Sequence, residues 1–91
     1  MDSKTNVNIS SKRQLMISVE GIIIPSRWDN QGNIVELAIA TRNEEEYLVA
    51  DEDQVTKLKP LLRKEAQVRG FLQTRDGKKV INVTEFSQKG Q

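Results

Sequence analysis

The sequence predicts a mainly β domain of five strands, with one helix between the third and the fourth strand. Along most of the chain, apolar residues alternate with polar ones, which is typical of half-buried strands. Between residues 50 and 64 the apolar residues instead recur at helical spacing. With 91 residues, of which 36% are hydrophobic and 30% charged, the chain suits one small globular domain. We place this domain at residues 14–87, between a disordered tail at 1–13 and a polar tail at 88–91.

The first predicted strand covers residues 14–24 and is long, about 11 residues against a usual 5 or 6. Its first half alternates apolar and polar side chains, and Gly21 then interrupts the pattern. A glycine inside a strand often marks a bulge or a sharp bend. The isoleucines at 22–24 indicate burial on both faces. We therefore expect a bent strand that serves two sheets.

Residues 25–32 combine Pro, Ser, Asp, Asn and Gly, which predicts a turn. The second strand follows at residues 33–41, with its larger apolar residues on one face. Ala38 and Ala40 lie on the opposite face. We expect these two alanines to form a flat surface that a base or a partner strand can approach closely.

The third predicted strand, residues 47–50, is short, and its sequence leaves two orientations open. Either Tyr47 and Val49 point into the core, or Leu48 and Ala50 do.

The helical stretch begins with acidic residues at 51–53, which suit a helix N-terminus. Pro60 removes a backbone donor and disfavours a continuous helix. We expect either a short helix starting near Asp53 or two turns with a break before Pro60. The apolar residues of this stretch form one stripe: Val55, Leu58, Leu61 and Leu62.

Two more strands are predicted at residues 66–74 and 80–86, where apolar and polar residues alternate again. Between them, Asp76-Gly77 is a strong signal for a two-residue hairpin turn.

The element order, the place of Gly21 and the segment "VRGFLQTRDGKKVINVTEF" together resemble the oligonucleotide/oligosaccharide-binding (OB) fold of small bacterial domains. The resemblance covers residues 14–87 and implies a five-stranded Greek-key barrel, with Val55, Leu58 and Leu62 plugging one end. An SH3-like barrel is the alternative, although it usually has only a short turn where this chain has a helical stripe. No motif of a particular OB family is present.

The resemblance also implies a binding face on the second and third strands, flanked by the loops that join strands one to two and four to five. A cation beside an aromatic ring on such a loop can pair with a phosphate while the ring stacks on a base. The expected function is weak binding of single-stranded nucleic acid, without catalysis. The candidate contact residues are Arg27, Trp28, Arg69, Arg75, Lys78 and Lys79. Trp28 has an alternative role as a cap on the end of the barrel.

Acidic residues between Glu44 and Asp53 flank the third strand and would repel phosphates there. Only 4% of the residues are aromatic, and the net charge is +1. These observations favour an alternative function, a protein-interaction or assembly module that pairs with another chain or with itself through a strand edge.

The chain contains no cysteine and no histidine. Thiol nucleophiles, Cys/His zinc sites and the usual proton carrier near neutral pH are therefore absent. We expect no enzyme activity, no cofactor and no metal. No apolar run approaches the roughly 20 residues of a membrane span, and we expect a cytoplasmic protein without membrane partners.

Overall fold

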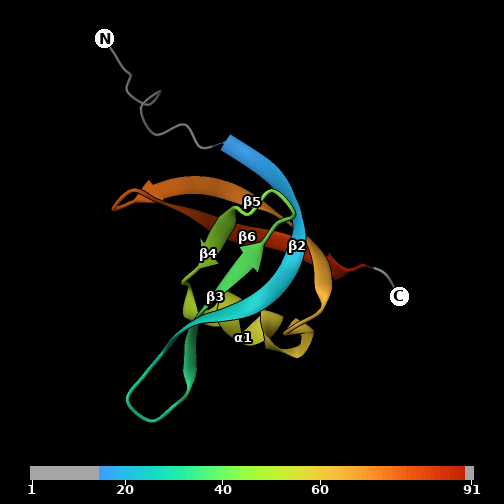
Figure 1. The fold of residues 1–91 in the computed structure, drawn as a ribbon. Coiled ribbons are helices and arrows are strands. Elements are labelled where there is room, and N and C mark those ends of the chain that lie inside the picture. The colour runs from blue at the N-terminus through green and yellow to red at the C-terminus, as the bar shows by residue number, and fades with distance from the viewer. Residues whose placement is uncertain (1–14, 90–91) are drawn as a thin grey trace.

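A computed structural model describes residues 15–89 and shows a closed, mainly β barrel of five strands (Figure 1). The strand order around the barrel is β2-β3-β4-β6-β5, and one helix lies between the third and fourth strands, as the OB-like prediction requires. The predicted tail at 1–13 lies outside the described residues. The elements are β2 (Leu15–Trp28), β3 (Ile34–Ala40), β4 (Glu46–Val49), α1 (Glu52–Leu58), the 3-10 turn η2 (Lys59–Leu61), β5 (Glu65–Arg75) and β6 (Lys78–Gln88).

The long first strand has two neighbours, which belong to one closed sheet rather than to the two sheets expected. Residues 15–22 of β2 pair with β5, and residues 22–28 pair with β3. Gly21 lies at this change of partner, where a Cβ atom would collide with the backbone of Ala40. The barrel closes through a parallel bridge between Leu48 of β4 and Val80 of β6.

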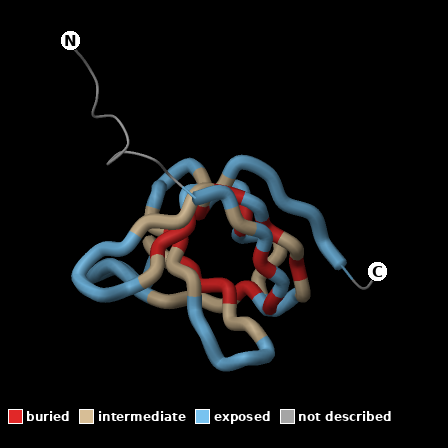
Figure 2. The backbone as a smooth tube through the Cα atoms, turned by 90° about the horizontal axis from the view of Figure 1, so that it is seen from above, coloured by how far each residue is buried: buried red, intermediate tan, exposed pale blue. Residues whose placement is uncertain are grey.

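The core fills the inside of the barrel, where the buried segments form the inner ring in Figure 2. Val49 is fully buried and Tyr47 packs against the core, so the third strand turns these two side chains inward. Leu48 therefore lies on the outer face. The largest fully buried side chains are Ile23, Leu37, Ile39, Leu58, Ile81, Val49 and Val68.

The helix starts where its sequence predicts, because the Asp51 carboxylate accepts the backbone N–H groups of Asp53 and Gln54 at 3.0 and 3.2 Å. It buries Val55 and Leu58 against the barrel. It then gives way to η2, a 3-10 turn in which Pro60 removes no α-helical hydrogen bond. None of the helices within residues 15–89 is long and apolar enough to cross a membrane.

Three local predictions were wrong. The turn expected at residues 25–32 is shorter, because β2 continues to Trp28. The pairing of β2 with β3 changes register between Pro25 and Trp28, and such an irregular part of a ladder can contain a proline. Ile22 is 40% exposed rather than buried on both faces. The flat alanine surface is absent at Ala38, which is fully buried because Ile24 and Leu48 flank it in the sheet.

The last strand extends further than its sequence pattern predicts. Strand β6 runs to Gln88, two residues beyond the predicted end at residue 86. The N–H of Lys89 then donates to the carbonyl of Glu65 at 2.9 Å. The first two residues of the predicted polar tail are therefore attached to β5.

Candidate functional site

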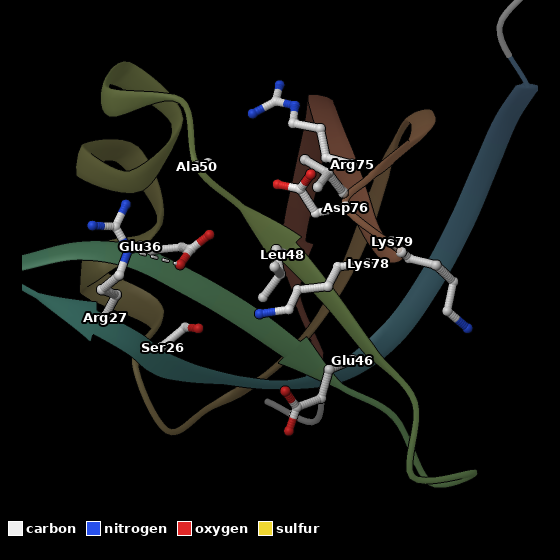
Figure 3. A pocket seen from close by; sticks show the side chains of 12 residues that line it. Ser26, Arg27, Glu36, Glu46, Leu48, Ala50, Arg75, Asp76, Lys78 and Lys79 are labelled. Carbon is white, nitrogen blue, oxygen red and sulfur yellow. Dashed lines mark hydrogen bonds and ion pairs between the residues drawn. The ribbon is translucent and has the colours of Figure 1, made fainter.

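A groove of about 670 Å³ crosses the outer face of β3 and β4, between the β2–β3 and β5–β6 hairpins (Figure 3). This is the face on which the OB-like resemblance implies a ligand site. Four basic and three acidic side chains line it: Arg27, Arg75, Lys78 and Lys79, with Glu36, Glu46 and Asp76. We call it the hairpin groove.

The hairpin groove has a small apolar part in its middle. Leu48 and Val80 lie there, at the bridge that closes the barrel, together with Ala50. No aromatic side chain is among the lining residues, because Tyr47 turns into the barrel. A ligand therefore finds charge and a little apolar surface in the groove itself, but no ring to stack on.

Two of the four cations are held by carboxylates. The Nε atom of Arg27 lies 3.2 Å from Oε1 of Glu36, whose side chain is only 14% exposed. The ammonium of Lys79 lies 3.2 Å from Oε1 of Glu45, and it points away from the groove in Figure 3. These ion pairs reduce the positive charge that Arg27 and Lys79 present to a ligand.

Lys79 belongs to a small cluster at the side of the barrel. Its ammonium lies 4.8 Å from the centre of the Tyr47 ring, and the Tyr47 hydroxyl donates to Glu45 at 2.9 Å. This hydrogen bond, with help from Lys79, lowers the pKa of Glu45 below its ordinary value. The same hydrogen bond raises the pKa of Tyr47. The cluster therefore holds Lys79 in place rather than leaving it available to an anion.

Arg75 and Lys78 are the other two cations, and neither forms an ion pair with another residue of the 15–89 range. They are cross-strand neighbours around the turn at Asp76-Gly77, where both turn residues have positive φ as the predicted hairpin requires. In Figure 3, Lys78 extends across the middle of the groove and Arg75 lies at one end. These two side chains are the ones best placed to meet an anion.

Trp28 adjoins the groove but does not line it. It follows Arg27 at the end of β2 and is 53% exposed, so the ring does not cap the barrel. The loop after it is ordered by Asp29, whose carboxylate accepts the N–H groups of Gln31 and Asn33 at 2.8 and 2.9 Å. These hydrogen bonds lower the pKa of Asp29, and the one from the N–H of Asn33 has the largest effect. The structure thus presents an exposed ring on an anchored hairpin.

Arg69 lies apart from the other candidate residues. It is on the outer face of β5, where its guanidinium pairs with Glu85 of β6 at 3.0 Å. The structure therefore brings Arg27, Arg75, Lys78 and Lys79 into one groove, leaves Trp28 beside it and places Arg69 elsewhere.

The sequence-based candidates did not include the acidic members of the groove, Glu36, Glu46 and Asp76. The alternation along the second strand places Glu36 on the outer face with Ala38 and Ala40, so this residue was open to prediction. Its ion pair with Arg27 depends on the register between β2 and β3, which brings the two residues opposite each other.

Within residues 15–89, no group of three or more acidic, histidine or cysteine side chains is arranged to hold a metal ion. The groove offers charge–charge contacts and hydrogen bonds.

No known family model matches the chain, and the searches of curated proteins and of solved structures found no significant match either.

Proposed function

We propose that the protein is a non-enzymatic binding module of the cytoplasm that holds single-stranded nucleic acid weakly in the hairpin groove. The observation that carries this proposal is the position of Lys78 and Arg75. They enter the groove from one hairpin. The exposed Trp28 follows the groove residue Arg27 at the end of β2, where the other hairpin begins. A strand that crosses the groove reaches both kinds of contact.

The chemistry of a single strand suits this arrangement. Its phosphates pair with lysine and arginine, and each base offers a face for stacking on an aromatic ring. Trp28 is the one candidate ring at the groove, and a stacked base contributes about 1–3 kcal/mol. The carboxylates of Glu36, Glu46 and Asp76 oppose phosphate binding. We therefore expect weak, salt-sensitive affinity.

A titration of intrinsic fluorescence tests the proposal, because Trp28 is the chain's only tryptophan. Single-stranded DNA and RNA oligonucleotides at low salt are expected to quench its emission. Neutralising two phosphates gives a slope of log affinity against log salt of roughly −1.4, and four phosphates give roughly −2.8.

Charge variants identify the surface. Lys78→Gln and Arg75→Gln are each expected to weaken binding and to make the salt slope shallower by roughly 0.7. Arg69→Gln removes the same charge from β5 outside the groove and serves as the matched control, with the slope unchanged. Glu46→Gln removes a repulsive carboxylate and is expected to tighten binding. If no oligonucleotide quenches Trp28 at low salt, the proposal is overturned.

A second candidate function, an interaction or assembly module, is favoured by a different observation. Leu15, Met16 and Ile22 are large apolar residues of β2, and they are 63%, 41% and 40% exposed. All three lie outside the hairpin groove. These exposed side chains along β2 give another chain apolar surface to cover.

A further inference from the structure

The first half of β2 has an edge without a partner strand in the described part of the chain. Residues 15–21 pair with β5 on one side, whereas β3 joins β2 only from Ile22 onward. A strand edge of this kind presents backbone N–H and C=O groups that can hydrogen-bond to an added strand.

A second groove, of about 940 Å³, lies along this edge. One wall is formed by residues 18–22 of β2, and the other by Ala40 and the β3–β4 hairpin at residues 41–43 and Glu45. Tyr47, Glu65 and Lys89 complete the lining. The groove lies directly beside the strand edge, where an added strand would pair at a spacing of about 4.8 Å. It shares no lining residue with the hairpin groove.

The edge carries exposed apolar side chains as well as the polar Ser18 and Glu20, and the Glu20 carboxylate is paired with the ammonium of Lys89 at 2.7 Å. Of the five large hydrophobic residues exposed within residues 15–89, three lie at or next to this edge: Leu15, Met16 and Ile22. Ser18 stands at the centre of the run of seven residues from 15 to 21. A partner that supplies an extended, partly apolar strand would satisfy both the backbone groups and these side chains.

We propose that this partner is a second copy of the chain, with the two β2 edges paired antiparallel about a twofold axis at Ser18. The inference rests on the interaction-module function and names its partner. Closed twofold dimers need a surface that is complementary to itself. The run from 15 to 21 meets this condition when the two copies overlap fully.

The side chains that this antiparallel pairing places opposite each other are compatible in size and polarity. Ile17 lies opposite Val19 of the second copy, so the inner face of the joined sheets is apolar on both sides of the axis. Leu15 lies opposite Gly21, beside which the backbone of Ala40 occupies the place of a side chain. On the outer face, Met16 lies opposite Glu20 of the second copy, and the methionine covers the aliphatic part of the glutamate.

Sedimentation equilibrium of the full chain tests the proposal, with an expected mass of twice 10.4 kDa at high concentration. Met16 provides the decisive variants. Met16→Glu places a carboxylate opposite Glu20 twice per dimer and is expected to weaken association by roughly 2- to 30-fold. Met16→Lys places an ammonium at the same points and is expected to dimerise more tightly than Met16→Glu by at least that factor. Thr56→Glu adds the same charge on the exposed face of α1 and leaves association unchanged.

Circular dichroism melts show whether each variant is folded. If the folded wild-type chain is monomeric up to about millimolar concentration, the proposal is overturned. Dimerisation only after removal of residues 1–13 would then identify the chain's own N-terminal segment as the occupant of the edge. Equal weakening by Met16→Glu and Met16→Lys would overturn the register. None of these outcomes affects the oligonucleotide titration, which tests a separate surface.

Discussion

The side chain of Gln54 on α1 accepts a hydrogen bond from the backbone N–H of Val83 on β6, with 2.7 Å between Oε1 and N. Its amide nitrogen also donates to the side chain of Asn82. Val83 pairs with Gly70 of β5, and the register between β5 and β6 shifts directly after this pair. Gln54 thus attaches the helix to β6 close to the point where the ladder is interrupted.

We predict that Gln54→Ala destabilises the protein by about 1–3 kcal/mol, because the N–H of Val83 is left without its acceptor in a partly buried site. Urea unfolding measures this change. Thr56→Ala, on the exposed face of the same helix, is the matched control and is expected to change stability by less than about 0.5 kcal/mol. Equal effects of the two substitutions would contradict the role of Gln54.

Leu58 is fully buried at the end of the barrel that α1 covers. Leu58→Asp is expected to cost more than about 4 kcal/mol, since it buries an unpaired charge or expels the helix. Thermal melting checks this, with Lys57→Asp on the exposed side of the helix as the control. A Leu58→Asp variant that melts within a degree of wild type would show that the helix does not seal the core.

The order of the elements could be predicted because each element carries its own local signal. The period of the apolar residues changes at Ala50, and Asp76-Gly77 supplies the two positive φ angles of a tight hairpin. The end of β2 could not be predicted in this way. Its last residues, Pro25 to Trp28, look like a turn, and they are extended only because β3 pairs with them through shifted registers.

The candidate site was predictable in part for the same reason. The fold resemblance placed Arg27, Arg75 and Lys78 on two loops that face one groove, and the structure brings them there. Which cations are neutralised depends on tertiary pairing. Lys79 was a candidate by position, but its ammonium lies against Glu45 and the Tyr47 ring, a contact that no local pattern reveals.

The carboxylate of Asp29 orders the loop beside Trp28, and its pKa is lowered by the N–H groups that it accepts. A lowered pKa in the folded state means that the ionised form stabilises the fold. This contribution is complete above the ordinary value near 3.8 and is lost as the pH falls through the lower folded pKa. We therefore predict that Asp29→Asn destabilises the protein at neutral pH and that the difference from wild type shrinks below about pH 4.

Unfolding measured at a series of pH values tests this prediction. Gln31→Ala keeps the carboxylate and is expected to retain the acid dependence of the wild type. A difference between Asp29→Asn and wild type that stays constant from pH 7 to pH 2 would show that the ionised carboxylate does not stabilise the loop.

Trp28 stands on the exposed end of β2, with 53% of its surface open to solvent. We therefore predict that Trp28→Ala changes the free energy of unfolding by no more than about 0.5 kcal/mol, as is usual for a surface position. The emission of the folded wild-type protein is expected to be red-shifted and accessible to a neutral quencher such as acrylamide. If the ring sealed the barrel, the same substitution would cost about 3–5 kcal/mol, and the emission would be blue-shifted. The melt and the emission spectrum need no ligand, so they establish whether Trp28 is free to stack before any oligonucleotide is added.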